Sequence, residues 1–225
     1  HEAEERGDDK DREIYVNWWK MLAEKFRNKS YTIGFNLFTE LNNTSPIRQD
    51  IDRYNDWTKR AVAVIRSVDK KRMIILASPT KNSPGLSEID PSIYRNDSYM
   101  MAEWHLYASG PNQSGGQKNW VGDGSQSDRD NIKRVIDIAL DFTEQTGIPT
   151  WLGAWMMYDN QGGSISEEEG RIFAKVFLRK LWRAGIPWSV NALPHYYDEK
   201  NNLWLDTHSY GGVVVDMNVI CDILV

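Results

Sequence analysis

Strand-like apolar runs and segments with helical periodicity alternate along almost the whole chain. We predict helices over residues 14–26, 54–68, 127–145 and 166–184. We predict strands over residues 31–38, 72–78, 99–107, 150–156 and 187–193. Regular alternation of helices with continuous apolar strands predicts a parallel sheet covered by helices. Two architectures fit this pattern, a doubly wound sheet and a barrel.

Local signals support the boundaries of several helices. Ile14, Trp18, Leu22 and Phe26 recur at helical spacing, which predicts the buried face of the first helix. Ser166 with Glu169 three residues on is the pattern of a capping box. No glycine-rich phosphate loop follows any strand, which counts against a nucleotide-binding doubly wound sheet.

The strand count constrains the barrel alternative. Five strands cannot close an eight-stranded (β/α)8 barrel. If the fold is a TIM barrel, about the first three strands are missing from this sequence, and residues 1–225 form one domain that contributes strands 4–8. The chain starts without an initiator methionine or a signal-peptide pattern, so we expect an interior piece of a longer chain or a processed product.

Composition narrows the classes of partner. With 40% hydrophobic and 26% charged residues, the chain can bury a sizeable core. A net charge of -5 argues against a nucleic-acid partner, and no apolar run approaches a membrane span. Ten tryptophans suggest that some indole rings stack on the apolar faces of sugar rings in a cleft. The single cysteine, Cys221, excludes an internal disulfide, and no residue spacing suggests a metal site or a cofactor.

Polar side chains gather where the predicted strands end. Glu40 follows the strand at 31–38, and a carboxylate beside an apolar strand is costly to bury without a purpose or a partner. His105 and Tyr107 share one face of a strand by its period of two, and Asn191 lies near the end of the last strand. Active sites of parallel β/α folds lie at these C-terminal strand ends.

Five stretches resemble glycoside hydrolase family 5, the cellulase-like enzymes, in the order in which that family carries them. Residues 31–42 resemble its fourth strand, which reads aromatic-Glu-aliphatic-aliphatic-Asn-Glu-Pro. Residues 60–76 resemble the helix before its fifth strand and that strand. Residues 104–107 resemble its sixth-strand His-x-Tyr motif. Residues 147–155 resemble its seventh strand, which reads Gly-Ile-Pro, aliphatic residues and Gly-Glu. Residues 185–188 begin a plausible eighth strand, so the resemblance covers about residues 11–206.

The resemblance implies a secreted, periplasmic or cell-surface retaining glycosidase that acts on a β-linked polysaccharide or oligosaccharide. It makes Glu40 the general acid/base, and it puts Ala154 where the nucleophilic glutamate should stand. Thr39 replaces the asparagine that binds the sugar 2-hydroxyl, and Leu41 replaces the usual proline. The residues expected to line the sugar-binding cleft are Thr39, His105, Tyr107, Trp120, Trp155, Trp188 and Asn191.

Ala154 has no carboxylate and cannot attack a sugar, which leaves several interpretations open. The alanine is either an engineered change that inactivates the enzyme or a natural feature of a non-catalytic carbohydrate-binding barrel. Glu103 is a candidate substitute nucleophile, although its depth in the strand favours a structural carboxylate. An unrelated α/β enzyme is the remaining alternative. The sequence does not identify the sugar, the linkage or the oligomeric state.

Overall fold

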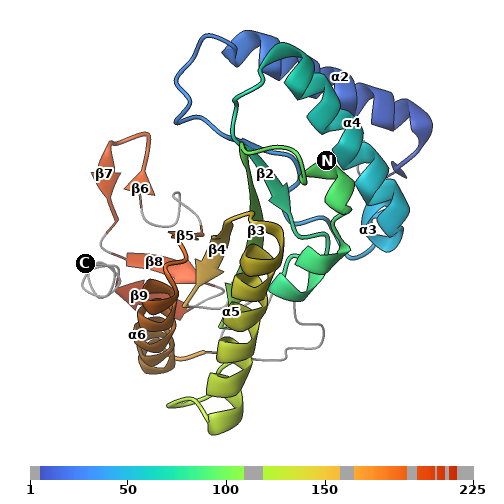
Figure 1. Ribbon diagram of the computed structural model, residues 1–225. Helices are drawn as coiled ribbons and strands as arrows, with labels where there is room; N and C mark the ends of the chain where they lie inside the picture. Colours follow the sequence, from blue (N-terminus) through green and yellow to red (C-terminus); the bar gives the residue numbers. More distant parts are fainter. Residues whose placement is uncertain are drawn as a thin grey trace. The chain divides into compact units, whose positions relative to one another are not determined.

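The computed structural model describes residues 6–108, 119–157, 165–191 and 197–205, together with the backbone of residues 207–210 and 213–216 (Figure 1). The helices are α2 (Asp9–Phe26), α3 (Pro46–Gln49), α4 (Ile51–Val68), α5 (Gln126–Thr146) and α6 (Glu167–Ala184), with 3₁₀ helices η1 (Ser83–Glu88) and η2 (Pro91–Ile93). The strands are β1 (Phe35–Asn36), β2 (Ile74–Ala77), β3 (Met100–Tyr107), β4 (Thr150–Met156), β5 (Trp188–Val190), β6 (Tyr197–Asp198), β7 (Leu203–Trp204), β8 (Thr207–Tyr210) and β9 (Val213–Asp216).

The first five strands form the parallel sheet that the sequence predicts. They are hydrogen-bonded in the order β1-β2-β3-β4-β5, which is also their order in the chain. Phe35 of β1 lies opposite Ile74 of β2, and Ala77 of β2 lies opposite Glu103 of β3, both in parallel register. A doubly wound sheet reverses its strand order at a switch point, whereas a barrel adds each strand beside the previous one. The order therefore favours a partial (β/α)8 barrel.

Two antiparallel hairpins, β6–β7 and β8–β9, follow the parallel strands along the chain. Neither hairpin is predicted from the sequence. The whole chain divides into two compact units, each of which is described by itself. The first unit contains residues 1–104 and 141–150, and the second contains residues 105–140 and 151–225.

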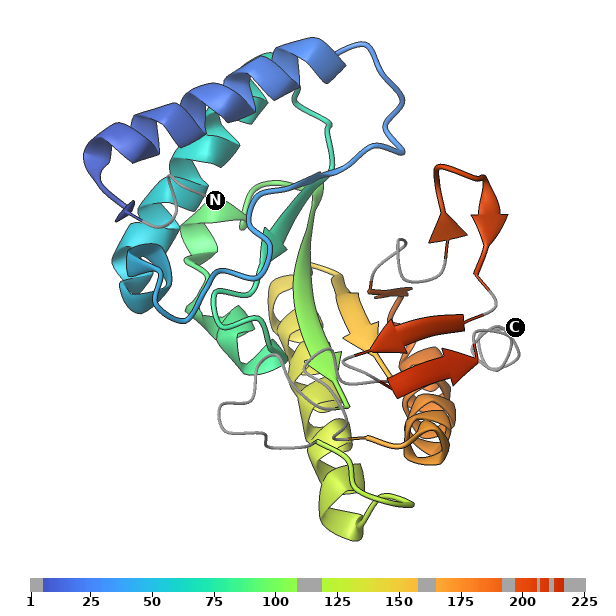
Figure 2. The same ribbon diagram turned by 180° about the vertical axis from the view of Figure 1, so that it is seen from behind.

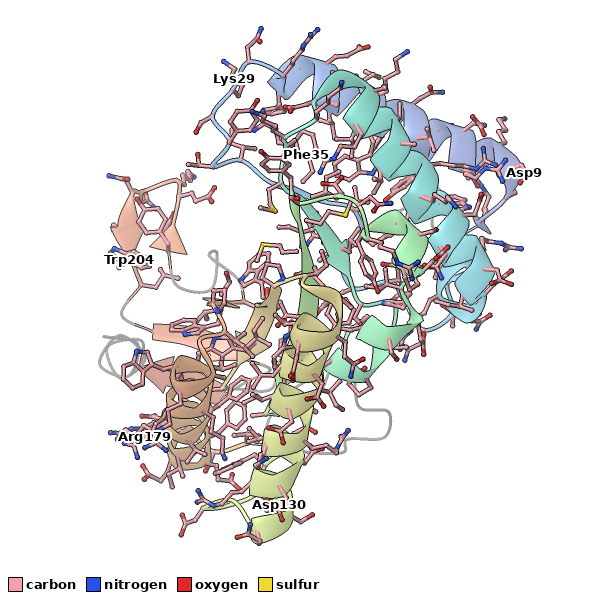
Figure 3. The ribbon with its side chains drawn as sticks, in the orientation of Figure 1. Asp9, Lys29, Phe35, Asp130, Arg179 and Trp204 are labelled. Carbon is pink, nitrogen blue, oxygen red and sulfur yellow. The ribbon has the colours of Figure 1, made fainter. Side chains whose placement is uncertain are left out.

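In the first unit, α2 and α4 lie side by side, as both views show (Figures 1 and 2). Tyr15 of α2 stacks on Phe38 with ring centroids 4.8 Å apart, and it lies 5.5 Å from the ring of Trp57 of α4. Trp19 packs against Phe35, 5.6 Å away. Figure 3 shows Phe35 among the side chains below the two helices. This aromatic cluster fixes the orientation of α2.

The predicted buried face of α2 is wrong. Ile14, Trp18 and Leu22 are 40%, 65% and 36% exposed, and the buried side carries Tyr15 and Ala23 instead. The helix has apolar residues on two adjacent sides, and periodicity alone does not distinguish them. The side with Tyr15 is buried because Tyr15 packs against the rings of Phe38, which follows β1, and Trp57 of α4.

The side chain of Arg72 binds the backbone that connects α2 to β1. Its guanidinium is fully buried, and it donates to the backbone carbonyls of Phe26, Lys29, Ser30 and Ile33. It also donates to the buried carboxylate of Asp69 at 3.2 Å. A buried guanidinium is tolerated only when its donors are satisfied. The arginine thus closes the connection between α2 and β1.

In the second unit, α6 begins and ends as predicted. The Ser166 hydroxyl accepts from the Glu169 backbone, the Glu169 carboxylate accepts from the Ser166 backbone, and Gly185 ends the helix at φ 66. A left-handed residue in this place suits glycine. Phe173 and Phe177 on the buried side of α6 pack against Trp155 of β4.

Strand β4 matches its predicted range, while the first and last parallel strands are shorter than predicted. Only Phe35–Asn36 of the predicted strand 31–38 pairs as β1, because the chain turns at Tyr31–Thr32 and leaves the ladder after Leu37. The last predicted strand pairs over Trp188–Val190, and residues 192–193 lie outside the described residues.

Candidate active site

The C-terminal end of β1 leads into a short buried segment that carries Glu40. Leu37, Phe38 and Leu41 are 2–4% exposed, whereas Thr39 is exposed and Glu40 is half-buried. The buried neighbours on both sides fix the backbone, and Tyr15 donates to the Leu37 carbonyl at 2.6 Å. Glu40 therefore lies four residues beyond the end of β1, with its side chain partly open to solvent.

The backbone of Glu40 is left-handed, with φ 47. This conformation costs a residue with a β-carbon about 1–3 kcal/mol and tends to occur at functional sites. The chain after Glu40 is held by Arg48 of α3, which donates to the Leu41 carbonyl at 3.3 Å and to the Asn43 side chain. The loop thus maintains a strained residue at the position of the predicted acid/base.

A second cation, Lys81, lies on the loop after β2. Lys81 is half-buried, and both the Glu40 carboxylate and the Arg48 guanidinium act on its charge. Burial lowers the pKa of Lys81 below its ordinary value, Glu40 acts in the opposite direction, and Arg48 lowers it further. Burial also lowers the pKa of Arg48. We call Glu40, Arg48 and Lys81 the charged cluster. No sequence motif distinguished its two cations.

Glu103 occupies a buried position in β3 of the same unit. It is 3% exposed, and its carboxylate accepts a hydrogen bond from the Asn36 side chain of β1. The buried hydroxyl of Tyr54 donates to the Ala77 carbonyl of β2. Burial raises the pKa of Tyr54, and the charge of Glu103 raises it further. These contacts fit the structural carboxylate that the sequence favours for Glu103.

In the second unit, His105 and Tyr107 occupy the C-terminal half of β3. They are 4% and 1% exposed, and their rings meet edge to face with centroids 6.5 Å apart. The Tyr107 hydroxyl accepts from the Asn191 side chain at 2.8 Å, and its carbonyl accepts from the Asn119 side chain at 2.8 Å. We call His105, Tyr107, Asn119 and Asn191 the hydrogen-bonded cluster. It joins three of the residues predicted for the site and adds Asn119, which no sequence pattern distinguished.

Ala154 lies in an irregular part of β4. The pairing of β4 with β5 shifts register between Leu152 and Trp155, so the alanine stands within the irregularity. Such bulges often redirect a side chain beside an active site. Ala154 is 7% exposed. Just after it in β4, the Met156 carbonyl accepts from the Ala108 backbone N–H, and the Trp155 carbonyl accepts from the Asn191 backbone N–H. Position 154 is thus held by backbone bonds to both neighbouring segments of its unit.

The tryptophans predicted to contact sugar lie at different depths. Trp120 is fully buried, donates to the Gly122 carbonyl and packs edge to face on Phe173 of α6. Trp155 is also fully buried and contacts Phe173 and Phe177. Trp188 is half-buried and meets Trp155 edge to face at 5.8 Å. The packing of Trp120 and Trp155 favours a role in the core, and it leaves Trp188 as the more accessible indole.

Further observations concern metals and membranes. Within the described ranges, no group of three or more His, Cys, Asp or Glu side chains could hold a metal ion. None of the helices among the described residues is long and apolar enough to cross a membrane. The carboxylate of Asp198 closes the β6–β7 turn by accepting from the Lys200 and Asn201 backbones, and Cys221 lies outside the described residues.

Polar side chains that follow the C-terminal ends of parallel barrel strands are typical of the active sites of (β/α)8-barrel enzymes. The family model for cellulase, glycosyl hydrolase family 5, matches residues 1–190, and the chain belongs to this family. The resemblance seen in the sequence is therefore confirmed.

Curated relatives match a part of the chain. Endoglucanase H of Acetivibrio thermocellus is 25% identical over 142 residues, which are 63% of this chain and 15% of the relative. Endoglucanase C of the same organism is 28% identical over 97 residues, 41% of this chain and 25% of the relative. The chain thus spans a minor share of the curated relatives that it matches.

Solved structures share the fold over most of the chain. The Thermotoga maritima Cel5A structure in complex with cellobiose has a TM-score of 0.73 and 17% identity. The superposed region covers 96% of this chain and 67% of the Cel5A chain. The cellulose synthase subunit Z of Clostridioides difficile has a TM-score of 0.68 and 18% identity, and it covers 86% and 65%. The chain accordingly corresponds to about two thirds of these barrels, which confirms the predicted partial TIM barrel.

Proposed function

We propose that this chain is the C-terminal portion of a retaining glycoside hydrolase barrel that acts on β-linked polysaccharide or oligosaccharide, with Glu40 as the general acid/base. The observation that carries the proposal is the left-handed Glu40 at the end of β1, inside the part of the chain matched by the family. Solved relatives hold cellobiose and mannotriose, which supports a β-linked sugar as substrate. The proposal includes a secreted, periplasmic or cell-surface location, which the family resemblance implies.

The mechanism needs a second carboxylate. In a retaining glycosidase the two carboxyl groups lie about 5–5.5 Å apart. One protonates the leaving oxygen while the other attacks the anomeric carbon, and the first then removes a proton from the water that releases the sugar. We assign the nucleophile position to residue 154, where the alanine side chain has no oxygen to attack the sugar. The irregular pairing of β4 at this residue supports the assignment.

The remaining candidates have binding roles in this proposal. The half-buried Asn191 presents polar atoms to sugar hydroxyls, and its amide is held by Tyr107, whose ring packs against His105. Trp188 supplies an indole face for a sugar ring, and the exposed Thr39 lies beside the acid/base. No cofactor is needed for this chemistry, because the two carboxyl groups carry both the proton transfers and the covalent intermediate.

The decisive experiment restores the carboxylate in the full-length protein. We expect Ala154→Glu to hydrolyse β-linked glucans with retention, while the alanine protein and the isosteric Ala154→Gln protein stay inactive. Adding Glu40→Gln to Ala154→Glu should again lower kcat by about 10²–10⁴-fold, the usual contribution of a positioned acid/base. Hydrolysis by the alanine protein itself would mean that another residue is the nucleophile.

A non-catalytic carbohydrate-binding barrel is the second candidate, and Ala154 is the observation that favours it. It predicts that the alanine and glutamate proteins bind the same oligosaccharide with equal affinity and that neither releases a product. Calorimetry with a panel of β-linked oligosaccharides, run beside the activity assay, separates the two functions. If no sugar is bound or cleaved by either protein, both are wrong.

A further inference from the structure

The surface of α2 has three sides of different character. One side is buried and carries Tyr15 and Ala23. A second side carries exposed polar residues, which are Glu13, Asn17, Lys20 and Glu24. Between these two sides lie four apolar residues at helical spacing, Ile14, Trp18, Met21 and Leu22. Their exposed fractions range from 36% to 65%, and we call them the apolar stripe.

A helix with two apolar sides packs against two neighbours. Single apolar residues on a surface are ordinary, but four along one side of a helix form a continuous patch that soluble proteins rarely leave open. In a (β/α)8 barrel the helices form an outer ring, so each helix has a neighbour on either side. Helix α4 is one neighbour of α2, and both views show the two side by side (Figures 1 and 2). The apolar stripe marks the place of the other neighbour.

Strand β1 has an open edge in the same unit. Among the described residues, β1 pairs with β2 alone and ends the parallel sheet. The backbone N–H groups of Phe35 and Leu37 donate to carbonyls of the β2 segment at 2.9 and 3.2 Å. Since the hydrogen-bonding groups of successive residues point to opposite sides of a strand, those of Asn36 are directed to the open edge. Such an edge is a template for a further strand.

We propose that the apolar stripe of α2 and the open edge of β1 form the surface on which the preceding part of the same barrel packs. The strand that precedes α2 pairs with β1, because a helix that connects two parallel strands packs back on their sheet. The helix before that strand covers the apolar stripe. This chain corresponds to 67% of the Cel5A chain, so a barrel of that size has a further third from which these elements come.

The direct test measures the accessibility of Trp18 in the full-length protein. Hydroxyl-radical labelling with mass spectrometry gives a rate for each tryptophan, in the folded protein and in urea. In the structure Trp18 is 65% exposed and Trp57 of α4 is 1% exposed. Labelling scales with exposed area, so a covered Trp18 should be labelled at least roughly fivefold more slowly in the folded protein than in urea, as Trp57 should be. A smaller slowing at Trp18 overturns the inference.

A pair of variants of the full-length protein provides the second readout. Trp18→Glu puts a charge into the proposed interface and should lower the urea midpoint of unfolding by about 1 M. Lys20→Glu, on the exposed polar side of the same helix, should change the midpoint by less than about 0.3 M. Equal midpoints in the two variants contradict the interface.

Analytical ultracentrifugation of the same protein identifies what covers the stripe. We expect Trp18 to be protected in the monomer. Protection that occurs only at concentrations where the protein dimerises would identify a second copy of the chain as the occupant and overturns the inference. None of these readouts uses activity, so the interface stands even if the proposed function fails.

Discussion

The charged cluster and the hydrogen-bonded cluster hold their side chains at strand ends by opposite means. In the charged cluster, Glu40 and Lys81 have strained backbones, are half-buried and act on each other through charge. In the hydrogen-bonded cluster, Tyr107 has regular strand geometry, is 1% exposed and is held by the amides of Asn119 and Asn191. One cluster depends on electrostatics and backbone constraint, and the other on directed bonds in a dry environment.

The difference is consistent with the different tasks that we propose for the two clusters. A carboxylate that exchanges protons needs some access to solvent and neighbours that adjust its charge, which the charged cluster provides. A frame that orients a ligand needs side chains with one conformation, which buried and mutually bonded groups provide. The comparison also locates what is missing, because position 154, beside the hydrogen-bonded cluster in β4, carries no charge. The following predictions test whether charge, burial or strain is responsible for each difference.

The largest effect is expected where charge and burial coincide. Arg72→Met should lower the free energy of unfolding by about 3–5 kcal/mol, because it leaves the buried Asp69 carboxylate without its partner and several carbonyls without donors. Urea unfolding followed by circular dichroism measures the loss.

The control for Arg72 is Arg12→Met. Arg12 is less deeply buried and contacts Asp9 and Asp56, which are both more exposed. A loss as small as in this control would show that burial does not determine the strength of charged contacts in the first unit.

The next largest effect is expected from the loss of one hydrogen bond in the hydrogen-bonded cluster. Tyr107→Phe deprives Asn191 of this acceptor without changing the shape of the ring, and it should cost about 1–2 kcal/mol. Tyr54→Phe is the matched change in the first unit, where the hydroxyl donates to the Ala77 carbonyl. Similar losses in the two proteins would confirm that the second unit relies on ordinary buried hydrogen bonds. A loss confined to Tyr54→Phe would contradict the bonded frame around Tyr107.

The strain at Glu40 is tested by a change that should stabilise the protein. Glycine adopts the left-handed region without a steric penalty, so Glu40→Gly should raise the free energy of unfolding by about 1 kcal/mol while removing the proposed acid/base. Glu40→Gln removes the charge and keeps the strain, so its stability should not increase. Equal stabilisation by both changes would mean that the charge of Glu40, and not its backbone, destabilises the loop.

The elements that the sequence predicted well are those with local signals. The range of α6 follows from the capping box of Ser166 and from Gly185, and β4 follows from an apolar run between Pro149 and a loop. The prediction of which side of α2 is buried was wrong, because the choice between its two apolar sides depends on rings distant in sequence, such as those of Phe38 and Trp57.

The candidate site shows the same division between local and distant information. Motifs identified Glu40, His105 and Tyr107, since each follows or ends a predicted strand. They did not distinguish Lys81, whose backbone donates to Ser78, or Asn119, which donates to Ala108 and Tyr107, because such contacts leave no periodic pattern in the sequence. Nor did period and composition reveal that Trp120 and Trp155 are buried against α6, because an indole suits a core as well as a sugar.

The smallest effect is expected where charge occurs without burial or strain. Arg60 pairs with Asp56 on α4 at 2.9 Å, and Lys133 pairs with Asp137 on α5, with all four side chains 41–64% exposed. Exposed pairs at this spacing contribute about 0.3–0.5 kcal/mol, and salt weakens them. Double-mutant cycles to alanine should therefore give the same small coupling in both pairs, and 0.5 M salt should reduce it. A coupling above about 1 kcal/mol in Arg60–Asp56 alone would mean that the first unit strengthens charge interactions generally, so that the charged cluster would need no special environment.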